Sequence, residues 1–235
     1  MKAITITREY GAGGGEVAKR LAEALGWQIL DRELLHQAAQ IEHVPDAELE
    51  RLDEKAVSAA DRFRLHPPHQ KYLHGLTVAA QVAAQRGNVV LVGRGARHLL
   101  GELPDIFHLR LVAPRGWRAE RMAKQEGWSP DQALARCLEV DRTRELFTRY
   151  FFGDAAVQPC RYDLVVNTAR VPLEDVTSAV ASVVRPSPAE DAVGPGRNRV
   201  LTISRELGAG ETQFPAALAE RLGMRAYDRE LLEEE

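Results

Sequence analysis

Residues 3–25 read AITITREYGAGGGEVAKRLAEAL, and this stretch decides the fold class. Its first part, Ala3–Thr7, is rich in β-branched residues, and its last part, Glu16–Leu25, has apolar residues at helical spacing before the stop signal Gly26. Four glycines occupy the five positions 11–15 between them. A strand that runs through such a turn into a helix can bind phosphate with its backbone N–H groups, although similar turns also serve close packing alone. The stretch therefore predicts an α/β fold and leaves both interpretations of the turn open.

Strands and helices continue to alternate along the chain. We predict further strands at Gln28–Leu30, Val89–Val92, Ile106–Val112 and Leu164–Asn167, and further helices at Arg32–Ile41, Gln70–Arg86, Arg115–Glu126, Pro130–Tyr150 and Leu173–Val184. Ser129 followed by Pro130 is typical of a helix start. Strands joined by helices form a parallel sheet between two helical layers, and such sheets bind ligands at the carboxyl ends of their strands. The sequence therefore predicts a doubly wound, three-layer α/β domain with its site at that edge.

The composition narrows the class of protein. The chain has 235 residues and a formal net charge of -3, which leaves room for one α/β domain with an appendage and gives no sign of a nucleic-acid-binding surface. No apolar run reaches the roughly 18 residues of a membrane span, and the N-terminal residues lack the apolar stretch of a secretory signal. Cys137 and Cys160 are too few for a disulfide framework. We therefore expect a soluble, cytoplasmic protein that binds neither nucleic acid nor membranes.

Histidines cluster at one place in the sequence, where His66, His69 and His74 surround two prolines. The cluster has no cysteine partner and lacks the spacing of a structural metal site. We therefore expect a solvated loop at 66–69 and no metal site.

The N-terminal stretch of the sequence is repeated near the end of the chain. Residues 4–35 align with residues 201–232 at about 17 identities in 32 positions. The residues between the copies include a segment rich in Pro, Gly and Ser, which is typical of a linker. We therefore predict a domain at 1–184, a flexible linker at 185–198 and a partial repeat of the N-terminal strand–loop–helix unit at 199–235. One strand and one helix cannot bury enough surface to fold alone. The repeat therefore either docks on a sheet edge, its own or that of a second copy in a homo-oligomer, or belongs to a longer tandem protein.

Six blocks of the chain together resemble a known family. They are ITITREYGAGGG at 4–15, LDRELL at 30–35, LVGRGA at 91–96, the Arg-rich segment 118–122, DRTR at 141–144 and YDLVVN at 162–167. In order and spacing they resemble the cytidylate kinase-like proteins, within the P-loop nucleoside monophosphate kinases. The resemblance implies a P-loop nucleoside-phosphate kinase fold, with a five-stranded parallel sheet of strand order 2-3-1-4-5 flanked by helices and a lid that closes over two nucleotides. It also implies phosphoryl transfer from ATP, with Mg²⁺, to a nucleoside monophosphate such as CMP or dCMP.

The resemblance assigns the donor site to the glycine-rich turn and to charged residues near it. The residues expected to bind ATP are Gly11, Ala12, Gly13, Gly14, Gly15, Glu16, Arg118 and Arg121. The two arginines, one helical turn apart after the fourth predicted strand, are expected to contact the donor phosphates or adenine.

The resemblance also assigns residues to the acceptor and to the transferring group. Arg94 matches an arginine that binds the acceptor phosphate, and Asp31 and Arg32 fall in the acceptor region. Asp31 is equally suited to cap the following helix. Arg32 stands where typical cytidylate kinases have a serine, which puts strict CMP specificity in doubt. Arg142 and Arg144 match arginines that stabilise the transferring group, with a solvated helix face as the competing interpretation. Their helical spacing predicts that only one of them reaches the site.

The glycine-rich turn departs from the standard phosphate loop, G-x-x-x-x-G-K-S/T. Arg8 stands at the first glycine position, Gly14 at the lysine position and Gly15 at the hydroxyl position. In the second copy the lysine position holds Glu211, a negative charge where phosphates would lie. The two side chains that normally act on the phosphates and on magnesium are therefore absent from the first copy.

Losing the lysine should lower the rate by about two to three powers of ten unless another cation replaces it. Arg8 and Lys19 are the candidates for that cation. Two functions follow from the sequence. The first is a nucleoside monophosphate kinase in which Arg8, Arg94, Arg142 and Arg144 are catalytic. The second is a nucleotide-binding regulatory or structural module without efficient transfer.

Overall fold

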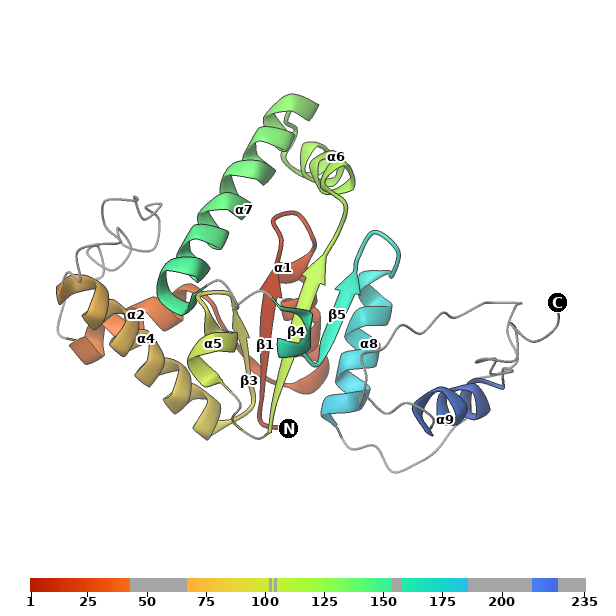
Figure 1. The fold of residues 1–235 in the computed structure, drawn as a ribbon, viewed down its shortest axis with the longest axis horizontal. Coiled ribbons are helices and arrows are strands. Elements are labelled where there is room, and N and C mark those ends of the chain that lie inside the picture. The colour runs from red at the N-terminus through yellow and green to blue at the C-terminus, as the bar shows by residue number, and fades with distance from the viewer. Residues whose placement is uncertain (43–66, 102, 104, 154–157, 186–212, 224–235) are drawn as a thin grey trace. The chain divides into compact units, whose positions relative to one another are not determined.

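The chain divides into two compact units, Met1–Pro186 and Ser187–Glu235. The computed structural model of the protein describes residues 1–42, 67–101, 103, 105–153, 158–185 and 213–223. In the first unit, five strands form one parallel sheet in the order β2-β3-β1-β4-β5 (Figure 1). The predicted fold class and the strand order 2-3-1-4-5 are confirmed.

The described elements follow the predicted alternation closely. The strands are β1 (Ala3–Arg8), β2 (Gln28–Leu30), β3 (Val89–Val92), β4 (Ile106–Val112) and β5 (Leu164–Asn167). The helices of the first unit are α1 (Gly14–Leu25), α2 (Arg32–Glu42), α4 (Pro67–Arg86), α5 (Ala96–Leu100), α6 (Arg115–Glu126), α7 (Pro130–Phe152), the 3₁₀ helix η3 (Pro159–Arg161) and α8 (Leu173–Val184). Each strand lies within one residue of its predicted range.

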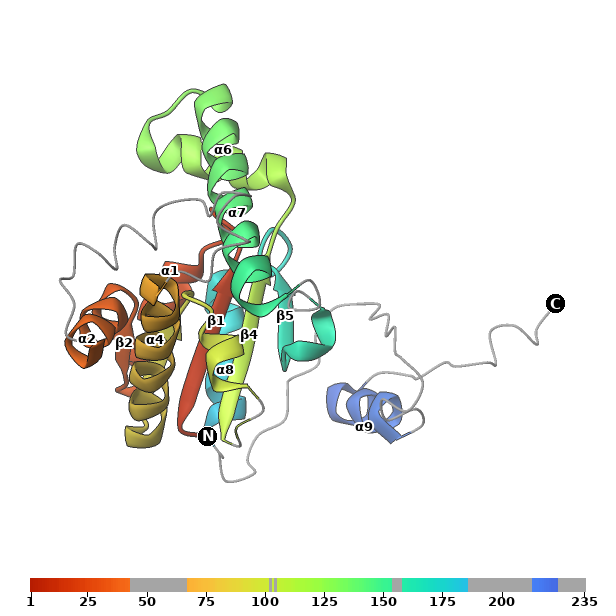
Figure 2. The same ribbon diagram turned by 60° about the vertical axis from the view of Figure 1, so that its left-hand side comes forward.

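Helices cover both faces of the sheet (Figures 1 and 2). On one face α1 and α8 pack against alternate strand residues such as Ile4 and Leu109, which are completely buried. On the other face α2, α4 and α5 pack against residues such as Leu91, with Leu76 of α4 also completely buried. Because the apolar contacts occupy both faces, the carboxyl ends of the strands are the edge that remains for a ligand.

The helix after the glycine-rich turn begins earlier than predicted. Gly13 has a left-handed backbone (φ 82°) and α1 starts at the next residue, Gly14, rather than at Glu16. The predicted stop at Gly26 is confirmed, since this residue is also left-handed (φ 67°) and its N–H is directed to the last carbonyls of the helix.

In the middle of the chain one prediction was wrong and one helix was not predicted. The expected loop at 66–69 is helical over its described part, because α4 begins at Pro67. Prolines suit this place, since the first N–H groups of a helix have no intrahelical partner. His66 lies outside the described residues. The five-residue helix α5 was not predicted because it is too short to show a helical period.

Helices α6 and α7 form a hairpin beyond the carboxyl ends of the strands (Figures 1 and 2). Ser129 starts α7 as predicted: its hydroxyl accepts a hydrogen bond from the N–H of Gln132 at 3.3 Å, and its own N–H donates to Oε1 of Gln132 at 3.0 Å. Met122 of α6 and Cys137 of α7 share a small apolar core. The two helices of the hairpin therefore pack against each other, and α7 then continues toward α4.

In the second unit the structure describes α9 (Gln213–Leu222). This helix lies in the second sequence copy, and it ends before Gly223, whose φ of 63° resembles that of Gly26, its counterpart in the first copy. The other residues of the predicted repeat and of the linker at 185–198, apart from Arg185, lie outside the described residues. Among the helices that the structure describes, none is long and apolar enough to cross a membrane.

Candidate active site

A cavity of about 630 Å³ lies at the carboxyl ends of β1, β3 and β4, beneath α7. Its lining consists of Thr7, Arg8, Asp31, Gly93, Arg94, Gly95, His98, Arg110, Arg136, Glu139, Val140, Thr143, Arg144, Phe147, Thr148 and Tyr162. Five of these side chains are arginines and two are carboxylates, so the formal charge of the lining is 5 − 2 = +3 with neutral histidine. A cavity of this charge is suited to a ligand that carries several negative charges.

The glycine-rich turn between β1 and α1 borders this cavity through Arg8. Within the described part of the chain, the N–H groups of Gly13, Gly14 and Gly15 donate no hydrogen bond. They lie at the N-terminus of a twelve-residue helix, where free N–H groups and the helix dipole favour an anion.

Close packing also explains part of the glycine content. A Cβ added at Gly11 would lie 3.0 Å from Cγ of Met122, and one at Gly13 would lie 2.7 Å from Cδ1 of Leu173. A Cβ at Gly15 would meet nothing within 4 Å. Packing therefore accounts for Gly11 and Gly13 but not for Gly15.

Arg118 holds the turn in place. Its side chain is 5% exposed, and its guanidinium donates to the carbonyl oxygens of Tyr10 at 2.8 Å and Ala113 at 2.9 Å. It also pairs with Asp141 at 2.5 Å and with Glu9 at 3.4 Å. Arg118 therefore links the turn to α6 and α7, and it is not among the residues that line the cavity.

Asp141 and Arg121 bind the same turn from α7 and α6. Asp141 accepts a hydrogen bond from the N–H of Tyr10 at 2.8 Å while its other oxygen pairs with Arg118. Arg121 donates to the carbonyl of Gly11 at 3.1 Å and pairs with Glu16 at 2.8 Å. Three charged side chains of the α6–α7 hairpin, Arg118, Arg121 and Asp141, therefore hold the backbone of the turn.

Arg8 and Arg94 lie on either side of Asp31 at the floor of the cavity. The shortest distances are 3.7 Å from Arg8 Nη2 and 3.6 Å from Arg94 Nε to the carboxylate oxygens of Asp31. Burial, together with the nearby charge of Arg144, lowers the pKa of Arg8 to about 10 against the opposing effect of Asp31, so its guanidinium is charged at neutral pH. Arg32 opens α2, but its side chain lies outside the described part of the structure.

Arg94 has an unusual backbone conformation. Its φ is 54°, and the flanking residues Gly93 and Gly95 are also left-handed, with φ of 72° and 70°. A residue with a side chain rarely adopts this conformation unless the surrounding structure imposes it, and such residues concentrate at functional sites. The strained turn directs a charged side chain, only 16% exposed, toward Asp31.

The two arginines of the DRTR block separate as their helical spacing suggests. Arg144 lines the cavity, donates to the carbonyl oxygen of Arg8 at 3.1 Å and lies 5.9 Å from the ring centre of Tyr10. Burial lowers the pKa of Arg144, with the charge of Asp141 acting in the opposite direction. Arg142 is not among the cavity-lining residues. The exposed side chain of Lys19, the alternative cation, is also absent from the lining.

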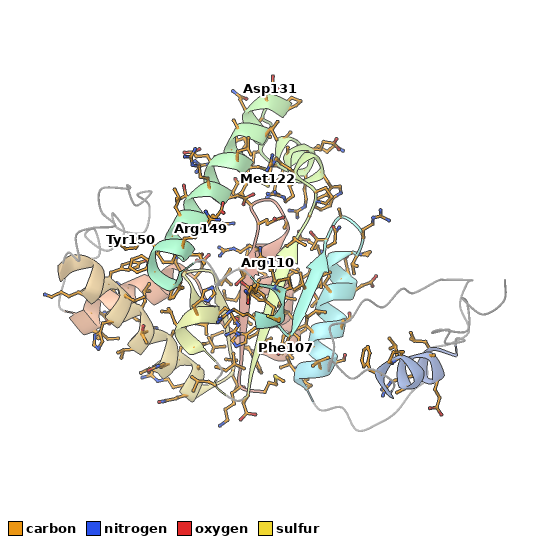
Figure 3. All side chains as sticks on the ribbon, in the orientation of Figure 1. Phe107, Arg110, Met122, Asp131, Arg149 and Tyr150 are labelled. Carbon is orange, nitrogen blue, oxygen red and sulfur yellow. The ribbon has the colours of Figure 1, made fainter. Side chains whose placement is uncertain are left out.

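Several lining residues were missed by the sequence analysis. Arg110 of β4 donates to the hydroxyl of Tyr162 at 3.3 Å, and its guanidinium lies 5.3 Å from the centre of that ring. Figure 3 labels Arg110 near the centre of the first unit. An arginine that alternates with buried apolar residues near the end of a central strand was the signal available in the sequence.

His98 of α5 is a second residue that the sequence analysis missed. Its ring stacks on Phe152 of α7 with 4.7 Å between ring centres. Burial, reinforced by neighbouring positive charges that begin with Arg97, lowers the pKa of His98 to about 4, so the ring is neutral at pH 7. This residue therefore adds no charge to the cavity.

Comparison with known proteins gives a consistent result. The model of the cytidylate kinase-like family matches residues 3–170. A cytidylate kinase of Natronomonas pharaonis is 28% identical over 194 residues, which cover 81% of this chain and 93% of the relative. A cytidylate kinase of Halobacterium salinarum is 29% identical over 197 residues, which cover 82% of this chain and 94% of the relative.

A solved structure has a similar fold. It is an uncharacterised protein from Eubacterium ventriosum with a TM-score of 0.59 and 20% identity, and the match covers 78% of this chain and 98% of the other. At this identity the likeness concerns the fold alone.

Proposed function

The chain belongs to the cytidylate kinase-like family, and from that membership we propose that it transfers the γ-phosphoryl group of ATP to a nucleoside monophosphate, with CMP or dCMP as the leading acceptors. The observation that carries the proposal is the cavity of charge +3 beside the free N–H groups of the glycine-rich turn. Transfer between two nucleotides brings about four phosphate groups together, and these need positive charge and fixed geometry more than covalent help.

The donor phosphates would lie on the N–H groups of Gly13, Gly14 and Gly15, with the rest of the turn, including Gly11 and Ala12, shaping that surface. Arg118 and Arg121 would position the turn, because they donate to the carbonyl oxygens of Tyr10 and Gly11, and Glu16 would hold Arg121. Direct contact of these three residues with ATP stays a prediction of the resemblance.

The acceptor would lie in the cavity. We assign its phosphate to Arg94, with Asp31 holding Arg94 and Arg8 in place. Arg110 and Tyr162 lie on the same wall and would contact the remaining part of the acceptor.

The reaction itself needs no covalent intermediate. An oxygen of the acceptor phosphate forms a bond to the γ-phosphorus while the bond from that phosphorus to the β–γ bridging oxygen breaks, and ADP leaves with the electron pair. Arg8 and Arg144 lie where the turn meets the cavity, and they would stabilise the charge on the transferring group. Arg142 is exposed and does not line the cavity, so this proposal assigns it no contact with the transferring group.

Mg²⁺ accompanies ATP in kinases generally, but the described residues do not fit a standard magnesium site at this turn. Gly15 offers no hydroxyl, and Glu9, Glu16 and Asp141 are engaged with arginines or backbone N–H groups. No group of three or more His, Cys, Asp or Glu among the described residues could hold a metal ion. In this proposal Mg²⁺ arrives with ATP, and no residue is assigned to it.

The test is a direct assay of the full chain. Purified protein is mixed with ATP, Mg²⁺ and, in turn, CMP, dCMP, UMP, AMP and GMP, and ADP release is followed. We expect a turnover of about one per second or more with a pyrimidine acceptor. Arg94→Ala should lower kcat/KM for the acceptor at least about 100-fold, whereas Arg170→Ala, an exposed arginine before α8, should have no effect. ATP binding without turnover for any acceptor would instead establish the regulatory or structural module.

A further inference from the structure

Arg8 occupies a space that two glycines leave open. A Cβ added at Gly14 would lie 2.5 Å from Cγ and 2.9 Å from Cβ of Arg8. A Cβ added at Gly93 would lie 1.7 Å from Nη1 of Arg8. The stem of the side chain therefore lies against the start of α1, and the guanidinium lies against the turn after β3.

This arrangement excludes a lysine at position 14. In the standard phosphate loop the first position is glycine and the seventh is lysine, and here the corresponding residues are Arg8 and Gly14. The Cβ of any residue at position 14 would collide with the stem of Arg8, which is not a flexible end that can easily move. A long side chain fits at position 8 or at position 14, but not at both.

The guanidinium of Arg8 also reaches the place where a loop cation is needed. Its side chain is 18% exposed and lines the cavity, 3.7 Å from Asp31. The carbonyl oxygen of Arg8 accepts a hydrogen bond from Arg144, which fixes its backbone at the junction of turn and cavity. In the proposed function, the donor and acceptor sites meet at this junction.

We propose that two of the three departures of the loop, those at positions 8 and 14, are one exchange: Arg8 replaces the missing lysine as the residue that binds the γ-phosphate, and Gly14 and Gly93 provide the space that its side chain requires. The inference deepens the proposed kinase function and rests on it for the identity of the ligand. It predicts that the cation can be moved back to position 14 only when Arg8 is removed.

The test compares wild type with Arg8→Gly, Gly14→Lys and the double variant Arg8→Gly/Gly14→Lys. Each single substitution should lower kcat about 100-fold or more, the first by removing the cation and the second by displacing it. The double variant restores the glycine and the lysine of the standard pattern, while position 15 stays glycine, and its kcat should exceed that of Arg8→Gly at least tenfold. A double variant no faster than Arg8→Gly, or a Gly14→Lys variant as fast as wild type, would overturn the exchange.

A stability measurement tests the shared space without any assay of activity. Gly14→Ala should lower the melting temperature by several degrees in the presence of Arg8 and have little effect in an Arg8→Gly background. Equal effects in the two backgrounds would contradict the steric part of the proposal.

ATP and ADP affinities, measured by calorimetry, separate this inference from the proposed function. Wild type should prefer ATP, Arg8→Gly should lose that preference, and the double variant should regain it. If wild type turns over no acceptor but these preferences hold, the proposed kinase function fails and the role of Arg8 stands. If turnover is present but Arg8→Gly keeps the preference and the rate of wild type, the inference fails and the kinase function stands.

Discussion

Gly95 is the residue at which the β3 turn meets the aromatic side chains of α7. Its backbone is left-handed (φ 70°), and a Cβ there would lie 2.5 Å from Cε2 of Phe152. Phe152 and Phe147 belong to an aromatic cluster with Tyr72 of α4. The turn after β3 therefore packs against the C-terminal end of α7 through this cluster. Glycine is required at this position for two separate reasons, backbone conformation and space.

The two reasons can be separated with a matched pair of variants. Gly127 has nearly the same backbone conformation (φ 71°), but a Cβ there would meet nothing within 4 Å. Gly127→Ala should therefore cost about 1 kcal/mol of unfolding free energy from backbone strain alone. Gly95→Ala should cost about 3 kcal/mol, because the methyl group also displaces Phe152. Urea denaturation measures both, and equal costs would show that Phe152 moves away freely.

His98 gives the protein a pH-dependent stability. Its folded-state pKa of about 4 lies below the ordinary value of 6.5, so between these pH values the unfolded chain binds more protons than the folded one. The contribution of His98 is therefore fully present above about pH 6.5 and is lost as the pH falls toward 4. The melting temperature of His98→Phe, which keeps the stacking on Phe152, should fall less than that of wild type between pH 7 and pH 4.5. A His98→Phe curve parallel to wild type would show that other groups cause the acid sensitivity.

At the scale of elements, α7 reaches from the aromatic cluster beside α4 to the glycine-rich turn. Figure 3 labels Arg149 and Tyr150 on the half of α7 near α4 and Asp131 at its opposite tip. Asp141 lies between them and accepts the N–H of Tyr10. A movement of α7 must therefore act on the turn, because one carboxylate joins the two.

Substitution of Asp141 tests this connection. Asp141→Ala leaves the buried guanidinium of Arg118 with one carboxylate partner fewer and should cost about 2–3 kcal/mol of stability. The KM for ATP should rise about tenfold, with a smaller change in kcat, because Asp141 positions the turn without touching the reacting atoms. Asp141→Asn keeps an acceptor for Tyr10 and should recover most of the ATP affinity. The control is Asp131→Ala on the same helix, and a KM unchanged by Asp141→Ala would mean that the turn keeps its shape without α7.

At the scale of the whole molecule, a truncated chain tests the predicted domain boundary after residue 184. A chain of residues 1–186 should keep turnover within about twofold and its melting temperature within a few degrees, since the sheet and the cavity lie in that unit. Size-exclusion chromatography of both forms would show whether residues 187–235 mediate association. A truncated chain that is inactive or unfolded would show that the second unit completes the fold.

The fold was predictable because its signals are local. The buried apolar run Val89–Val92 predicts a strand, and the N-cap at Ser129 predicts the start of a helix, each from a few neighbouring residues. Short helices such as α5 and η3 have no period to detect. The helix start at Pro67 was missed because two prolines resemble a loop when only their breaking effect is considered.

The candidate site was less predictable because its geometry depends on residues far apart in the chain. The sequence places Arg118 and Arg121 on one helix but does not reveal that their partners are the carbonyls of Tyr10 and Gly11. Arg110 and Tyr162 meet across 52 positions without any motif. The collision between position 14 and Arg8 becomes visible only when side-chain positions are known.

The bonds from Arg118 and Asp141 to Tyr10 span 108 and 131 positions of the chain. Contacts of such high sequence separation form late in folding, since long loops must close before they are made. Nucleotide affinity should therefore appear only when the α6–α7 hairpin has docked on the turn, a step with about the same sequence separation as the pairing of β1 with β4. The N-terminal strand–loop–helix unit therefore cannot be moved alone into another protein. Without α6 and α7 it would keep the glycines but lose Arg118, Arg121 and Asp141, which hold the backbone of the turn.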